Sequence, residues 1–194
     1  MTVEFQGRDT SPLSDAAFDA AAKTLGCDVA SIKAVAHVEA PRGGFIPDGR
    51  PELLFESHTF HIMTAGKYDE SHPGISTPSW VRNYGAGGEH QYDRLAEAIS
   101  LDRAAALQSA SWGKFQIMGM NYDPAGYHDV ESFVQDMCES EAYQLDAFVC
   151  FLQNTGADKF LIAHDWSSFA RSYNGPGQVE FYAGQIAAAY GKFA

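Results

Sequence analysis

The sequence has 194 residues, and its 25 acidic against 13 basic side chains give a net charge of −12. This length is typical of one domain, and 45% apolar residues suffice for a hydrophobic core, which excludes a wholly disordered chain. A strongly acidic protein is repelled by nucleic acid and by anionic membranes, so we expect neither as a partner, and a polyanionic substrate would have to bind in a local groove.

Neither a membrane span nor a secretory signal is visible in the sequence. No stretch approaches the roughly 20 apolar residues that cross a bilayer. Residues 1–14 lack the basic and apolar regions of a signal peptide. We therefore expect a protein made in the cytoplasm without a signal peptide and without stable membrane association.

The three cysteines, Cys27, Cys138 and Cys150, are an odd number and include no CxxC pair. A disulfide framework or a zinc cluster is therefore not expected. Because Cys138 and Cys150 follow the apolar pattern of one predicted helix, we expect buried free thiols there.

The beginning of the chain predicts an arm followed by a helix. Residues 1–13 are polar and aperiodic, which predicts a flexible N-terminal arm before a single domain over residues 14–194. A first helix fits residues 15–25, where Ser14 can cap the start and Gly26 can close the end.

A second helix follows the cap residue Asp28 and ends at Glu39, because Pro41 prevents it from continuing. The Asp48-Gly49 pair between two short apolar runs then predicts a β-hairpin, although prolines on both sides keep its strands short. The hairpin would thus be inserted directly after the helix that carries Glu39.

The rest of the chain is mostly helical in its pattern. Residues 58–88 are rich in His, Gly, Pro and Ser and predict a long ordered loop of the kind that carries function. Residues 111–120 predict a tight turn and another helix start, and Glu141 is an acidic residue on an apolar helical stripe. Helices are predicted over residues 90–108, 131–153, 157–163, 166–173 and 178–190. The expected fold class is mostly α with one small β-hairpin.

Glu39 is the most informative polar residue. A carboxyl group at a helix C-terminus faces the negative end of the helix dipole, and apolar neighbours also oppose its ionisation. Both effects raise the pKa, as a general acid near neutral pH requires. A glutamate in this position is more commonly a solvated helix end, so Glu39 alone leaves both interpretations open.

Three segments read together resemble the phage-type N-acetylmuramidase family of endolysins. They are residues 34–39 with 44–58, residues 109–119, and residues 169–177. The second and third are also similar to turns of goose-type lysozymes and soluble lytic transglycosylases. The resemblance spans residues 28–190 and implies a lysozyme-like α+β fold that cleaves the β-1,4 bond between N-acetylmuramic acid and N-acetylglucosamine in peptidoglycan. We expect no cofactor and no metal.

The resemblance also implies which residues form the site. Glu39 aligns with the catalytic acid of the family. The residues expected to bind the glycan are Ser111, Trp112, Gln116, Tyr173, Asn174 and His58. Amide groups would bond acetamido groups, and aromatic rings would offer flat faces to sugars. Two alternatives stay open, namely Trp112 as an ordinary core aromatic and residues 173–177 as a helix end followed by a turn.

A second carboxylate is expected to assist Glu39. Glu56 follows the predicted hairpin in a matching segment and is the favoured candidate, while Asp48 and Glu52 lie in the hairpin itself. A structural role for Glu56, such as holding the hairpin or Arg50, is the alternative. Lytic transglycosylases need no second carboxylate, because the muramic 6-hydroxyl attacks and gives 1,6-anhydro products. We favour hydrolysis.

The chain departs from its relatives at Arg42, where small residues are common. If this side chain points inward, it lowers the pKa of Glu39. Rival functions are a metal site at Glu56-x-His58-x-x-His61, which lacks a third ligand at a motif distance, and a non-catalytic peptidoglycan-binding module.

The resemblance implies a place of action but no means of delivery. We expect a monomer that acts on the cell wall in the periplasm, after release through holin pores or delivery by a secretion machine. With 194 residues, no separate cell-wall-binding domain is expected.

Overall fold

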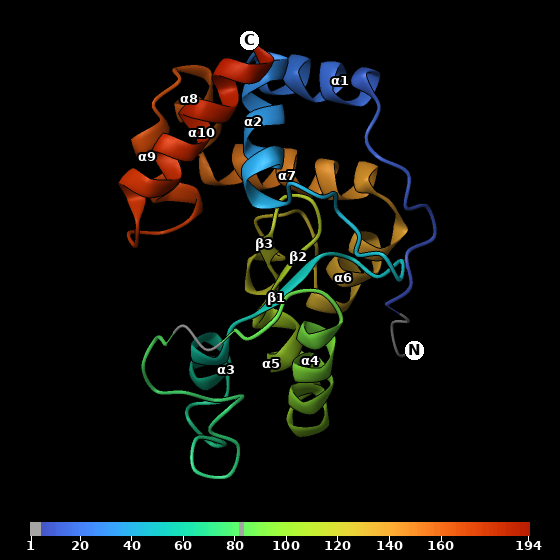
Figure 1. Ribbon diagram of the computed structural model, residues 1–194, viewed down its shortest axis with the longest axis vertical. Helices are drawn as coiled ribbons and strands as arrows, with labels where there is room; N and C mark the ends of the chain where they lie inside the picture. The colour runs from blue at the N-terminus through green and yellow to red at the C-terminus, as the bar shows by residue number, and fades with distance from the viewer. Residues whose placement is uncertain (1–4, 82–83) are drawn as a thin grey trace.

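The computed structural model describes residues 5–81 and 84–194. A small central sheet lies between two groups of helices, with α1, α2 and α7–α10 on one side and α3–α5 on the other (Figure 1). The elements are α1 (Asp15–Leu25), α2 (Val29–Glu39), β1 (Leu53–Phe55), α3 (Ser57–Met63), α4 (Glu89–Leu101), α5 (Arg103–Gln108), β2 (Ala110–Trp112), β3 (Ile117–Met118), the 3-10 turn η1 (Gly119–Asn121), α6 (Val130–Glu139), α7 (Glu141–Thr155), α8 (Asp158–Ile162), α9 (Trp166–Tyr173) and α10 (Val179–Phe193). The predicted mostly α class with a small β element is confirmed.

The first two helices begin and end at the predicted residues. The side chain of Ser14 accepts a hydrogen bond from the Ala17 N–H at the start of α1, and Gly26 ends the helix in the left-handed conformation with φ of 75°. Asp28 caps α2 in the same way by accepting from the Ser31 N–H at 2.7 Å. Local sequence alone therefore fixes where α2 begins.

Helix α2 is the buried helix of the molecule. Its residues Ile32, Ala34 and Val35 are fully buried, and both α1 and α10 pack against it. Figure 1 shows that its C-terminal end points toward the sheet. The helix ends at Glu39, so this carboxyl group faces the space between the two groups of helices.

The sheet is assembled from segments that are far apart in the sequence. Strand β1 pairs antiparallel with β2, with Phe55 opposite Ala110, and β2 pairs antiparallel with β3, with Trp112 opposite Ile117. Leu53 and Phe55 point into the core, so the alternate residues of β1 face the opposite side.

The predicted hairpin at Asp48-Gly49 is reduced to a turn. The Ile46 N–H donates to the Arg50 carbonyl at 2.8 Å, but beyond this turn only an isolated bridge joins Phe45 to Pro51. A proline has no N–H to extend such a ladder. The strand that follows finds its partner in β2 instead, which the local pattern did not predict.

The single helix predicted over residues 131–153 is two helices. Ser140 has an extended backbone, with φ of −170° and ψ of 168°, and it caps α7. Cys138 therefore lies on α6, where it is buried, and Cys150 lies on α7, where it is exposed. The expectation of a buried thiol is wrong for Cys150. Because the helix breaks at Ser140, the apolar positions of α6 and α7 do not lie on one continuous face.

Residues 5–13, part of the expected N-terminal arm, form no regular helix or strand and run along the domain. The ring of Phe5 contacts the ring of Trp112, the Gly7 N–H donates to the Gly49 carbonyl at 2.9 Å, and Asp9 forms a bridge with Ser140. Residues 1–4 of that arm lie outside the described residues, as do residues 82 and 83 of the expected loop. No helix in the described part of the chain combines the length and apolarity that a membrane span requires.

Glu141, the acidic residue on the apolar stripe, is a buried anchor at the start of α7. Its side chain is almost fully buried, and its two oxygens accept hydrogen bonds from the Leu13 N–H at 2.9 Å and from the Gly44 N–H at 2.5 Å. Buried polar groups are stable only when they are hydrogen-bonded, and here both oxygens have partners. One side chain thus joins the N-terminal arm to the loop after Glu39.

Gln144, one helical turn further on, holds the same loop to the turn between β2 and β3. Its Oε1 accepts from the Lys114 N–H at 2.6 Å, and its Nε2 donates to the Met137 carbonyl at 2.8 Å. A Cβ atom on Gly44 would collide with Gln144, so only glycine allows this close approach. The start of α7 therefore fixes the chain immediately beyond Glu39.

We predict that Glu141→Ala lowers the free energy of unfolding by about 2–3 kcal/mol, because two buried N–H groups lose a charged acceptor. Urea unfolding followed by circular dichroism measures the change. Glu97→Ala, which removes an exposed glutamate from α4, is the control and should change stability by less than about 0.5 kcal/mol. Equal stability of Glu141→Ala and wild type would contradict the anchoring role.

Candidate functional site

A groove of ≈ 450 Å³ lies beyond the end of α2. Glu39 and Glu56 both line it, as do Gln116 from the β2–β3 turn, Asn174 from the end of α9 and Trp80 from the long loop. Each of these residues comes from a different part of the chain. The groove therefore exists only in the folded protein.

Glu39 lies in this groove, where burial favours the neutral form of its carboxyl group. Burial raises the pKa of Glu39 to about 7, and a hydrogen bond from Asn174 opposes that rise in part. The Asn174 Nδ2 donates to Glu39 Oε1 at 2.8 Å. The raised pKa expected for a general acid is thus supported by the geometry, with burial as its main cause.

Glu56 lies at the other side of the groove, at the start of α3. The Tyr84 hydroxyl donates to its two oxygens at 3.0 and 3.1 Å. Burial raises the pKa of Glu56, while the Tyr84 hydrogen bond and the charges of Arg94 and His58 oppose the rise. The site therefore holds two carboxyl groups in different surroundings. Among the described residues, a hydroxyl donor and cationic side chains act on Glu56, whereas Glu39 is bonded by an amide.

A buried arginine fixes the backbone on both sides of Glu56. The Arg94 guanidinium donates to the Phe55 carbonyl at 3.0 Å, to Ser57 Oγ at 2.6 Å and to the Gly74 carbonyl at 3.2 Å. These bonds tie the end of β1 to the long loop. Arg94 thus positions Glu56 through its neighbours, a role that the sequence did not indicate.

The other carboxylates considered from the sequence lie elsewhere. Asp48 accepts a hydrogen bond from Arg50 Nε at 2.9 Å and caps its own turn. Glu52 lines a separate hollow together with Arg42. Arg42 therefore affects the pKa of Glu52 and is not among the causes of the Glu39 shift. The alternative in which Glu56 holds Arg50 is not observed, because Arg50 pairs with Asp48.

Gln116 and Ser111 reach the groove from the β2–β3 hairpin. Gln116 has a left-handed backbone, with φ of 49°, and its Nε2 donates to the Gly113 carbonyl at 2.8 Å. Ser111 Oγ lies 3.0 Å from Met118 Sδ. A non-glycine residue with positive φ is strained, and such strain is frequent at functional sites. The strained backbone of Gln116 is therefore consistent with a turn that places its side chain in the groove.

Tyr173 and Asn174 also line the groove, as expected. The Tyr173 hydroxyl donates to the Phe115 carbonyl at 2.6 Å, and its ring packs against Phe148 and Phe169. Asn174 Oδ1 is buried and has no hydrogen-bond partner among the described residues. The Asn174 amide is therefore enclosed, with its Nδ2 bonded to Glu39.

Two predicted binding residues do not line the groove. Trp112 is fully buried, and its Nε1 donates to the Leu107 carbonyl at 3.1 Å, so it is the core aromatic of the alternative interpretation. His58 Nδ1 lies 3.2 Å from the Thr77 carbonyl, and its ring stacks on His61. The burial of Trp112 could not be read from the sequence, and a glycan contact of His58 stays a prediction.

Sequence reasoning missed several residues of the groove. Trp80 lines it from the long loop and Tyr182 from α10, and Trp80 is 55% exposed. Met120 is also exposed there. An exposed tryptophan in a groove is a signal for sugar binding, but its exposure cannot be read from a loop sequence.

The rival metal site is not assembled. The His61 Nδ1 lies 2.8 Å from Asp69 Oδ2, and Asp69 in turn accepts from Ser76. Within residues 5–81 and 84–194, no group of three or more His, Cys, Asp or Glu side chains is placed to hold a metal ion. His61 and Asp69 instead fasten the long loop to α3.

A family model described as N-acetylmuramidase matches residues 28–194 of the chain. Among solved structures, the crystal structure of the endolysin of Burkholderia AP3 phage superposes with a TM-score of 0.83 at 38% sequence identity. The match covers 96% of this chain and 72% of that chain. No curated protein matches.

We predict that Glu39 makes stability depend on pH. Its folded pKa of about 7 lies above the ordinary value of 4.5. Its contribution is therefore complete below about pH 4.5 and is lost as the pH rises through about 7, by roughly 3 kcal/mol. The unfolding free energy of wild type relative to Glu39→Gln should fall by that amount between about pH 4 and pH 8 in urea titrations.

The control for this prediction is Glu97→Gln, which removes an exposed carboxylate from α4. Its stability relative to wild type should change little over the same range. A difference between wild type and Glu39→Gln that stays constant with pH would contradict the raised pKa of Glu39.

Proposed function

Since the chain belongs to the N-acetylmuramidase family and is a peptidoglycan-degrading glycoside hydrolase of the lysozyme type, we propose that Glu39 is its general acid and that hydrolysis is its reaction. The expected family and fold are thereby confirmed. The observation that carries the proposal is the desolvated Glu39 carboxyl group, whose pKa of about 7 leaves about half of the molecules protonated at pH 7.

In the proposed reaction Glu39 gives its proton to the oxygen between C1 of N-acetylmuramic acid and C4 of N-acetylglucosamine. The bond from C1 to this oxygen breaks, and N-acetylglucosamine leaves with a 4-hydroxyl group. The positive charge at C1 is stabilised by the carboxylate of Glu56, which faces the same groove. Water then adds a hydroxyl group to C1, and its proton restores the acid.

The surroundings of Glu56 support its role as the second carboxylate. Tyr84 donates a hydrogen bond to its oxygens, and the positive charges of Arg94 and His58 favour the ionised form. Among the described residues, no cation contributes to the pKa shift of Glu39. Two carboxyl groups whose surroundings separate their protonation states are what an acid and a charged partner need.

We also propose how the groove holds the glycan. Gln116 and Asn174 line the groove with amide groups, which would hydrogen-bond the acetamido groups of the glycan. Trp80 and Tyr182 offer ring faces to the sugars. Ser111 and Tyr173 line the floor, with Tyr173 fixed by its hydroxyl bond to Phe115.

Residues 14–194 would act as one catalytic unit and as a monomer on the cell wall. The likeness to a phage endolysin supports release at host lysis through holin pores, with delivery by a secretion machine as the alternative route. The acidic net charge of −12 argues against nucleic acid as a partner.

We predict that Glu39→Gln lowers kcat/KM on purified cell walls by about 10²–10⁴-fold, because the leaving oxygen loses its proton donor. Wild-type activity should fall about tenfold per pH unit above pH ~7, since Glu39 must be protonated. Turbidity loss measures both effects. Glu97→Gln should clear walls like wild type, and clearing by a folded Glu39→Ala protein would refute the role of Glu39.

The same digest identifies the reaction by mass spectrometry of the fragments. Reducing muramic ends are expected for hydrolysis. Fragments with 1,6-anhydro ends would show transglycosylation and would overturn hydrolysis as the reaction.

We predict that Trp80→Ala raises KM for glycan strands about threefold to tenfold, with little change in kcat, because a ring face for a bound sugar is lost. Tyr143→Ala is the matched control, since Tyr143 is 47% exposed on α7 and is not among the groove residues. Steady-state kinetics on soluble glycan chains give both constants. Equal KM values for the two variants would contradict a sugar contact at Trp80.

A further inference from the structure

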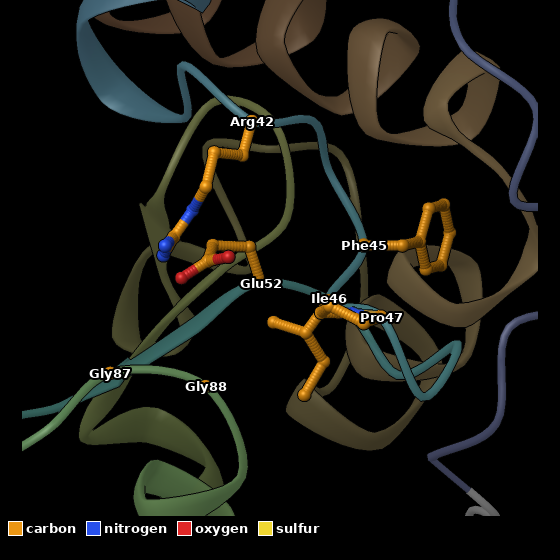
Figure 2. A pocket seen from close by; sticks show the side chains of 7 residues that line it. All are labelled: Arg42, Phe45, Ile46, Pro47, Glu52, Gly87 and Gly88. Carbon is orange, nitrogen blue, oxygen red and sulfur yellow. The ribbon is translucent and has the colours of Figure 1, made fainter.

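A second hollow of ≈ 410 Å³ lies next to the glycan groove. Arg42, Ile46, Pro47, Glu52 and Gly87 are among the residues that line it. Figure 2 shows the Arg42 guanidinium pointing toward the Glu52 carboxylate, with Ile46 and Pro47 on one side and the two glycines on the other. None of the steps proposed for Glu39 uses this hollow.

The hollow borders the groove along strand β1. Glu52 directly precedes β1 and lines the hollow, whereas Leu54 and Glu56, two and four residues later, line the groove. Side chains two residues apart on a strand point to the same face of the sheet. One face of the sheet therefore borders both the hollow and the groove. Arg42 follows Glu39 by three residues. A substrate cleaved at Glu39 therefore passes beside this hollow.

The lining of the hollow differs from that of the groove. The groove contains amide groups and aromatic rings suited to sugars, whereas the hollow has an apolar wall and two opposite charges. Burial raises the pKa of Glu52 and the charge of Arg42 opposes that rise. Such a lining suits a ligand with small methyl groups, a carboxylate and an ammonium group.

One part of peptidoglycan has this composition. The short peptide stem, which is joined to the lactyl group of muramic acid, carries alanine methyl groups, free carboxylates and, where its third residue is a diamino acid with a free amine, an ammonium group. An arginine guanidinium binds a carboxylate through two parallel hydrogen bonds, and a glutamate pairs with an ammonium. The glycines at the rim leave space, since a Cβ on Gly87 would meet no atom within 4 Å.

We propose that this hollow binds the peptide stem of a muramic acid next to the cleaved bond, with Arg42 contacting a stem carboxylate and Glu52 the stem ammonium group. The inference rests on the proposed function, because Glu39 defines where the bond is cut. It makes the enzyme selective for glycan that still carries its stems.

The test compares kcat/KM on glycan chains that carry stems with kcat/KM on chains from which an amidase has removed them. Wild type should prefer the stem-bearing chains. Arg42→Gln should lower this preference about threefold to fivefold, as loss of an exposed ion pair would. Gly87→Leu should lower it independently of charge, by filling the rim of the hollow.

Matched variants control for charge and for size. Arg8→Gln removes an arginine whose partner is Glu139, and Gly191→Leu adds a side chain to an open position at the end of α10. Both should keep the wild-type preference. A synthetic stem tetrapeptide titrated into the labelled wild-type protein should shift the amide resonances of Arg42 and Gly87.

The outcomes separate the two proposals. Equal cleavage of both substrates by wild type, or a preference that neither Arg42→Gln nor Gly87→Leu changes, would overturn stem binding and leave the proposed function intact. Failure of wild type to cleave either substrate would overturn the proposed function itself. Peptide-induced shifts elsewhere but not around the hollow would place the stem at another site.

Discussion

The structure depends on the hydrogen bonds that hold the loop directly after the end of helix α2. Helix α2 ends at Glu39, and the loop after it is held by the buried carboxylate of Glu141 through the Gly44 N–H. Gln144, on the same helix, holds the β2–β3 turn through the Lys114 N–H. A helix end without such partners would fray, and the acid would turn toward water. The start of α7 therefore governs both the shape of the groove and the burial of Glu39.

The different surroundings of the two carboxyl groups follow from that framework. Glu39 emerges from a buried helix into a space walled by Asn174 and Tyr173, so its charged form loses solvation. Glu56 lies between the Phe55 carbonyl and the Ser57 hydroxyl, which both accept hydrogen bonds from Arg94, and it accepts bonds from Tyr84. The same residue type thus acquires two protonation tendencies from packing alone. This difference needs no residue with unusual intrinsic chemistry.

The sequence predicted features that depend on neighbouring residues and missed features that depend on contacts between distant parts of the chain. The caps at Ser14 and Asp28 and the end of α2 follow from short-range rules, and they were predicted correctly. The break at Ser140 was missed, because a continuous apolar stripe conceals a change of direction. The motif around residue 112 identified the right turn, yet burial decides that Trp112 packs inward while Gln116 faces the groove. Trp80, Tyr84 and Arg94 carry no motif, since their importance comes from contacts with residues distant in the chain.

The bond between the Leu13 N–H and Glu141 spans 128 positions of the sequence. Synthesis proceeds from the N-terminus, so the arm and α2 leave the ribosome long before the start of α7 exists. Contacts of such large sequence separation form late in folding, because closing the intervening loop is entropically costly. The surroundings of Glu39 are accordingly completed only after the second half of the chain has emerged. A nascent or truncated chain would carry Glu39 without the enclosure that raises its pKa, and enzyme activity would report complete synthesis.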